Sequence, residues 1–273
     1  MLGRRPARIN ELLNQAIAHY ENEEFIKAKL LLQKVLKTDT SNITAIKLLG
    51  LLAHHKKQYE YSLSLLSRAI QIDPTQASTY LFRANVLQEI GHYDKALTDY
   101  NRAIIINNDY AEARNDRGLV LLYLGYLKKA LEDFNKAIDI KPDFSVAYNS
   151  RAKLMEELGR IDDAIIDYDR AISLNPNYES AYFNKSFQLL RKGDFSAGWE
   201  LYERRWQIKR YIPYKRKFTQ KLWSGKENLD GKVILLHWEQ GFGDTIQFAR
   251  YAREVKKLGA TVVLEVQKEL FEL

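Results

Sequence analysis

The chain has 273 residues, of which 46% are hydrophobic and 28% are charged, with 42 Lys and Arg against 35 Asp and Glu. This composition is typical of a globular protein and excludes a long disordered or collagen-like chain. Cysteine is absent, which excludes disulfides and thiolate sites, and we expect no bound metal and no cofactor. Only 5 prolines and 13 glycines are present, which favours a mainly helical fold over one of many short strands.

The N-terminal extension, residues 1–8, is basic and lacks the apolar stretch of a signal peptide. No run of about 18 apolar residues occurs, as a membrane-spanning helix would need. We therefore expect a soluble, cytoplasmic protein.

From Ile9 onward the sequence repeats with a period of 34 residues. The six frames are 9–42, 43–76, 77–110, 111–144, 145–178 and 179–212. Position 8 of the frames is always small, and its residues are Ala16, Gly50, Ala84, Gly118, Ala152 and Ser186. Position 20 is also small, and its residues are Ala28, Ser62, Ala96, Ala130, Ala164 and Gly198. Small residues at both positions predict a close contact between two helices in every frame.

The ends of the predicted helices are marked by glycine and proline. Position 15 is Gly91, Gly125, Gly159 and Gly193 in the last four frames, as expected where a left-handed residue ends a helix. Position 32 is Pro74, Pro142 and Pro176 in three frames, beyond the second helix. The pattern resembles the tetratricopeptide repeat and predicts an all-α superhelical solenoid of six helix pairs.

In this repeat family the first helices line a concave face, at positions 2, 5, 6, 9, 12 and 13. The polar residues expected there are Asn14, Asn85, Gln88, Glu89, Asn115, Asp116, Asn149, Ser150, Lys153, Glu156, Asn184 and Arg191. Side-chain amides both donate and accept hydrogen bonds, so a row of them can hold the backbone of an extended peptide. Similar asparagines line the groove of O-GlcNAc transferase.

Two alternatives weaken this interpretation. Exposed helix positions are usually polar, so several asparagines would occur there without a binding role. The first two frames also carry Leu13, Leu48 and Leu51 at the corresponding positions, which interrupts the amide row. That end is equally suited to an apolar partner or to self-association.

The stretch 204–226 contains nine Lys and Arg, no acid, and the aromatic residues Trp206, Tyr211, Tyr214, Phe218 and Trp223. Basic and aromatic residues together are also found in nucleic-acid and anionic-membrane binding segments. We favour a linker, residues 213–230, whose aromatic side chains are packed and whose charges face water.

Residues 231–273 predict a βαβ unit: an apolar strand at 233–238, a loop at 239–244, a helix from Thr245 to Leu258 and a strand at 261–266. The apolar run of the first strand is typical of a strand buried on both faces. A dinucleotide-binding fingerprint would need a third glycine where Ile246 stands.

The string from Gly231 to Phe248, with Leu222-Trp-Ser-Gly225 before it, resembles the start of the glycosyltransferase region of bacterial tetratricopeptide-repeat proteins, which are similar to O-GlcNAc transferases and heptosyltransferases. The resemblance implies an acceptor loop at Gly241, Gly243 and Asp244, with Asp244 as general base. An alternative role for Asp244 is the N-cap of the following helix. Such enzymes bind the sugar donor mainly through a second domain, which we expect to be missing after Leu273.

The leading hypothesis is a non-catalytic scaffold that holds a peptide or partner protein in its concave groove. The alternative is the N-terminal part of a protein glycosyltransferase. Nucleic-acid or membrane binding through residues 204–226 is a distant third hypothesis.

Overall fold

The computed structural model describes residues 4–239 and 241–272, with side chains of the first helix described from Arg8. The chain divides after Arg205 into two compact units, the solenoid unit and the C-terminal unit. No helix in the described ranges is long and apolar enough to cross a membrane.

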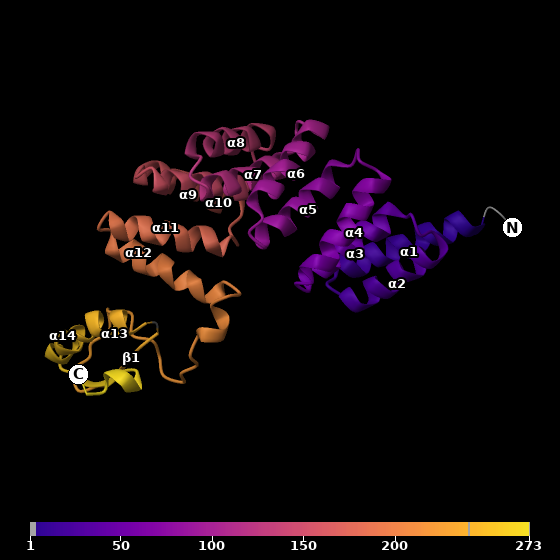
Figure 1. Cartoon of the computed structure of the whole chain (residues 1–273). Helices are drawn as coiled ribbons and strands as arrows, with labels where there is room; N and C mark the ends of the chain where they lie inside the picture. The colour runs from indigo at the N-terminus through magenta and orange to yellow at the C-terminus, as the bar shows by residue number, and fades with distance from the viewer. Residues whose placement is uncertain (1–3, 240, 273) are drawn as a thin grey trace. The chain divides into compact units, whose positions relative to one another are not determined.

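The solenoid unit consists of six antiparallel helix pairs, as the period predicts (Figure 1). The first helices of the pairs are α1 (Arg4–Glu21), α3 (Ile43–His55), α5 (Ala77–Glu89), α7 (Ala111–Tyr123), α9 (Ser145–Glu157) and α11 (Glu179–Arg191). The second helices are α2 (Phe25–Thr38), α4 (Tyr59–Ile72), α6 (Tyr93–Ile106), α8 (Leu127–Ile140), α10 (Ile161–Leu174) and α12 (Phe195–Tyr202). The prediction of an all-α solenoid is confirmed.

Small residues at positions 8 and 20 bring the two helices of a pair together. All twelve are buried, and the Ser62 hydroxyl donates a 2.7 Å hydrogen bond to the Gly50 carbonyl oxygen. A Cβ atom added to Gly118 would lie 2.6 Å from Cε1 of Phe134, so the ring occupies the space that a side chain would need. The volume at position 8 therefore sets how closely the bulky residue at position 24 approaches.

The predicted glycines end the first helices in the left-handed conformation, with φ between 70° and 84° at position 15 of the last four frames. The first two frames have no glycine there. Glu23 and Lys57 adopt the same conformation with φ of 58° and 57°, so the turn is kept without the residue that favours it.

A repeated ion pair links the helices of the third, fourth and fifth frames. Arginine at position 7 binds aspartate at position 23 of its own frame through two nitrogens, as Arg83 with Asp99, Arg117 with Asp133, and Arg151 with Asp167. The third nitrogen donates to position 25 of the preceding frame, which is Ser67, Asn101 and Asn135 in turn. We call these three groups the arginine clamps. Each one ties together three helices from two repeats.

The sixth repeat is shorter than its predicted frame, 179–212. Helix α12 ends at Tyr202 and is followed by the 3-10 helix η1 (Glu203–Gln207). Position 27, alanine in four earlier frames, is the buried Arg205, whose guanidinium lies 4.2 Å from the centre of the Tyr202 ring. A long cation in place of a methyl group is incompatible with the close helix contact of the earlier repeats.

The C-terminal unit contains a two-stranded parallel sheet, β1 (Val233–His237) with β2 (Thr261–Glu265), paired from Val233 with Thr261 to His237 with Glu265. Between the strands lie α13 (Phe242–Ala249) and α14 (Tyr251–Lys257). The parallel strands joined through helices agree with the predicted βαβ unit. Short 3-10 helices η2 (Ile212–Tyr214) and η3 (Lys268–Leu270) lie outside it.

Two details of this unit differ from the prediction. The helix begins at Phe242 rather than Thr245, because Gly243, although unfavourable within a helix, is tolerated in the first turn. It is also broken at Arg250 into α13 and α14. The strands are not buried on both faces. Ile234, Leu236 and Val262 pack against the buried cluster of Leu229, Val255 and Ala260, whereas Val233 is 72% exposed.

The basic segment 213–230 belongs with the C-terminal unit. Arg216 binds Glu265 at the end of β2 through two hydrogen bonds of 2.8 and 3.0 Å, and Trp223 packs against the core around Leu229. The Trp223 indole donates to the Glu227 carbonyl oxygen at 3.1 Å. Trp206 and Trp223 are each half-buried.

Candidate functional site

The concave face of the solenoid unit is formed by its first helices. Helix α5 contacts α3 and α7, and α7 contacts α9, whereas successive second helices in the described part of the chain meet less extensively. Closer first helices curve the stack inward, so their free side is concave. The groove residues predicted from the sequence lie on α1, α5, α7, α9 and α11, but their local environments differ.

Three predicted groove residues are buried between the first helices. Asn115, Asn149 and Ser150 are 1%, 4% and 2% exposed. The Asn184 amide on α11 donates a 3.1 Å hydrogen bond to Oδ1 of Asn149, so these two residues join neighbouring repeats. The concave face therefore does not present a continuous row of free amides.

The centre of the face has a polar cluster around Tyr100, the bulky residue at position 24 of the third frame. Its hydroxyl lies 2.6 Å from both Oδ1 of Asn85 and Oε1 of Gln88. The buried ring thus orients two amides that remain half-exposed. Tyr168 takes the same position two repeats later and donates to the carboxylate of Glu156. A tyrosine at position 24 with a polar residue at position 12 is the signal that could have found both pairs.

The pKa values of the acidic side chains on the concave face are shifted in different directions. Burial raises the pKa of Asp116, against the opposing effect of hydrogen bonds from Asn115 and Asn85. Burial likewise raises the pKa of Glu156, which lies near Lys153 and Arg191. The Glu89 carboxylate is hydrogen-bonded to the Tyr59 hydroxyl at 2.7 Å and to Nε2 of His54 at 2.5 Å. These hydrogen bonds lower the pKa of Glu89.

The two ends of the face are apolar. Leu13, Leu48 and Leu51 are half-buried at the N-terminal end, as the sequence predicts. At the other end Phe183, Phe187 and Tyr202 form an aromatic group with ring centroids 4.9 to 5.8 Å apart, and Phe187 is 42% exposed. Phe183 and Phe187 occupy positions 5 and 9 of the sixth frame and were not among the predicted groove residues.

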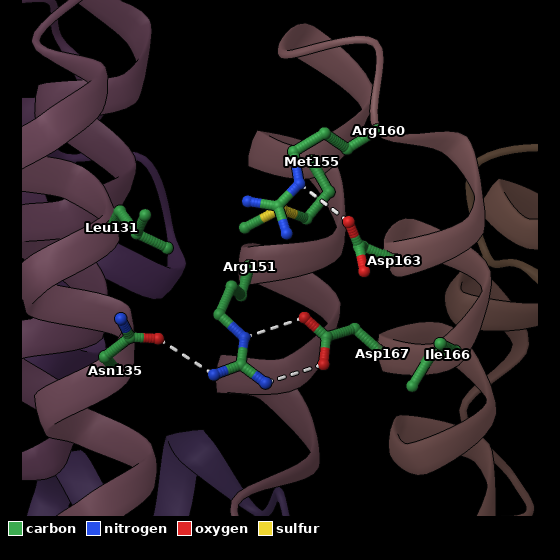
Figure 2. A pocket seen from close by; sticks show the side chains of 8 residues that line it. All are labelled: Leu131, Asn135, Arg151, Met155, Arg160, Asp163, Ile166 and Asp167. Carbon is green, nitrogen blue, oxygen red and sulfur yellow. Dashed lines mark hydrogen bonds and ion pairs between the residues drawn. The ribbon is translucent and has the colours of Figure 1, made fainter.

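A second hollow lies between the second helices, away from the concave face. Figure 2 shows this groove of about 300 Å³, with Leu131 and Asn135 of α8 on one side, Arg151 of α9 at its floor and Asp167 of α10 opposite. A similar groove of about 340 Å³ surrounds Arg83. The polar groups of the arginine clamps are paired with one another, which favours a structural role.

The predicted acceptor loop is only partly a loop, because Gly243 and Asp244 lie in the first turn of α13 (Phe242–Ala249). Residue 240, between β1 and α13, is outside the described residues. Gly241 is the N-cap of α13, and Gly243 and Asp244 are exposed. Asp244 lies in the first turn of the helix, so its predicted role as the N-cap is wrong. In the parts of the chain that the structure describes, His, Asp and Glu nowhere form a group that could hold a metal ion.

Comparison with known proteins supports the repeat assignment. A family model described as TPR repeat matches residues 84–125, and one described as tetratricopeptide repeat matches 111–144 and 145–178. The last two ranges have the bounds of the fourth and fifth frames. No curated protein sequence matches the chain.

Several solved structures share the fold. The crystal structure of MamA is 28% identical, covers 59% of this chain and 94% of its own, and has a TM-score of 0.51. PilF of Pseudomonas aeruginosa is 17% identical over 77% of this chain and 94% of its own, with a TM-score of 0.65. A tetratricopeptide repeat protein of Parabacteroides merdae is 20% identical over 77% and 80%, with a TM-score of 0.58. Residues 84–178 therefore match the tetratricopeptide repeat, and the solenoid unit has the fold of a tetratricopeptide-repeat solenoid.

Proposed function

We propose that the solenoid unit binds an extended segment of a partner protein on its concave face. The observation that carries this proposal is the pair of half-exposed amides, Asn85 and Gln88, which Tyr100 holds in place at the centre of the face. Side chains fixed in advance lose little conformational entropy when they bind a peptide backbone. The apolar ends supply surfaces for side chains of the partner.

A peptide selection tests this proposal. Random twelve-residue peptides displayed on phage are selected on the whole chain, and the affinity of the selected peptides is measured for single variants. We expect Phe187→Ala to weaken binding about five- to tenfold, on the order of 1 kcal/mol for a contact residue. Ile105→Ala, which changes a 72% exposed residue on the second helix α6, is the matched control. Equal affinity for both variants would place the peptide elsewhere.

We propose as a second candidate that the C-terminal unit is the start of a glycosyltransferase-like domain. The parallel pairing of β1 and β2 and the exposed first turn of α13, with Gly243 and Asp244, favour this alternative. The test is transfer from a common nucleotide-sugar to the selected peptides. We expect none from this chain alone, because a base without a positioned donor accelerates the reaction little. Transfer that Asp244→Asn abolishes would instead identify an enzyme.

A further inference from the structure

Asp116 on α7 is a half-buried carboxylate at the centre of the concave face. The Asn115 amide donates to its Oδ1 at 3.0 Å, and Asn85 of α5 donates as well. Both donors are neutral, and among the described residues Asp116 forms no ion pair. Burying a charge without a counter-charge is costly, so the carboxylate would gain from a cation supplied by a ligand.

The other acids near the groove differ in this respect. Glu112 forms an ion pair with Lys141 at 3.1 Å, and Glu89 is bound by His54 and Tyr59. Glu156 lies near Lys153 and Arg191 and accepts the Tyr168 hydroxyl. Asp116 is thus set apart by its lack of a cationic neighbour.

A second observation at the same place is an amide oxygen without a donor. Oδ1 of Asn115 is buried and has no hydrogen-bond partner. At the same position one repeat later, Oδ1 of Asn149 accepts from Asn184. The residue of α9 that corresponds to Asn184 is Ser150, whose side chain is shorter. A buried acceptor left unpaired is unfavourable, and a ligand donor would relieve the cost.

A tyrosine hydroxyl belongs to the same hydrogen-bond cluster as Asp116. The Tyr100 hydroxyl lies 2.6 Å from Oδ1 of Asn85, and the Asn85 amide donates to Asp116. Burial raises the pKa of Tyr100, and the negative charge of Asp116 raises it further. A carboxylate that has only neutral polar neighbours attracts an ammonium ion.

We propose that Asp116, beside the incompletely paired amide of Asn115, binds a primary ammonium group of the partner, either a lysine side chain or a free N-terminus. The inference rests on the proposed use of the concave face for binding. A compact ammonium suits the site better than a guanidinium, because the two amides already occupy part of the carboxylate and hinder a bidentate arginine.

Nuclear magnetic resonance titration of the whole chain with two small probes tests this inference. n-Butylammonium represents the lysine side chain, glycinamide represents the N-terminus, and n-butanol is the neutral control. We expect saturable shifts of the Asn85 and Asn115 side-chain amide signals with a Kd on the order of millimolar. The tighter probe identifies the source, and equal affinities support the shared ammonium chemistry.

Asp116→Asn is expected to weaken binding at least about tenfold while leaving the circular dichroism spectrum unchanged. The matched control Asp143→Asn removes the same charge from an exposed loop residue and should bind like the parent. Binding by the parent should also weaken on acidification at a higher pH than for an exposed aspartate, because burial raises the pKa of Asp116. Unchanged binding by Asp116→Asn, or no saturable shift in the parent, would overturn the inference. The peptide selection described above tests binding to the concave face independently of the ammonium probes, so failure of this inference can be distinguished from failure of the proposed function.

Discussion

Arg151→Ala is expected to lower the free energy of unfolding by about 3 kcal/mol, the lower end of the range for breaking a buried ion pair. Asp167, 6% exposed, would keep its charge without the two 2.7 Å hydrogen bonds that now neutralise it. Asn135 of the preceding repeat would lose its 2.8 Å bond as well (Figure 2). We expect the lower end of this range because the Arg151 side chain is 24% exposed, so water can partly solvate Asp167 once the guanidinium is removed.

Urea unfolding followed by circular dichroism measures this effect. Arg160→Ala is the matched control in the same groove, since its ion pair with Asp163 is about half-exposed and should be worth less than about 1 kcal/mol. Adding Asp167→Asn to Arg151→Ala should restore part of the loss, because a neutral amide replaces the unpaired charge. Equal destabilisation by Arg151→Ala and Arg160→Ala would contradict a stabilising role for the arginine clamps.

The clamps show where sequence reasoning reached its limit. Arginine and aspartate recur 16 residues apart in three frames, so the pair within one repeat could have been read from the sequence. The third bond, to position 25 of the preceding repeat, depends on the rotation between repeats, which no local pattern specifies. Helix pairing was predictable because it depends on side-chain volume at fixed positions.

The concave face illustrates the same limit. Asn115 and Asn149 share a position and a residue type, yet one bonds to its neighbour Asp116 and the other to Asn184 on the next first helix. Oδ1 of Asn149 accepts from Asn184 one repeat later, whereas Oδ1 of Asn115 is unpaired where the shorter Ser150 takes the corresponding position. Sequence could therefore place these residues on the first helices but not say which amides stay available.

Phe134→Ala should also have a large effect, about 3–5 kcal/mol, because the ring is fully buried and its removal leaves a cavity. Its neighbours Ala130, Leu121 and Leu154 belong to helices fixed by packing on both sides. Phe134→Leu should cost less than about 1.5 kcal/mol, since leucine fills position 24 in the first two frames. Phe195→Ala, at a 61% exposed site, is the control for loss of an aromatic side chain.

A second substitution at Gly118 tests the packing more sharply, because its effect should change sign. In the parent, Gly118→Ala places a Cβ atom 2.6 Å from the Phe134 ring and should cost about 1–3 kcal/mol through overpacking. In the Phe134→Ala background the same methyl group enters the vacated space. Alanine is also about 1 kcal/mol better than glycine within a helix, so there it should stabilise the chain by about that amount. Destabilisation in both backgrounds, measured by urea unfolding, would contradict the contact between positions 8 and 24.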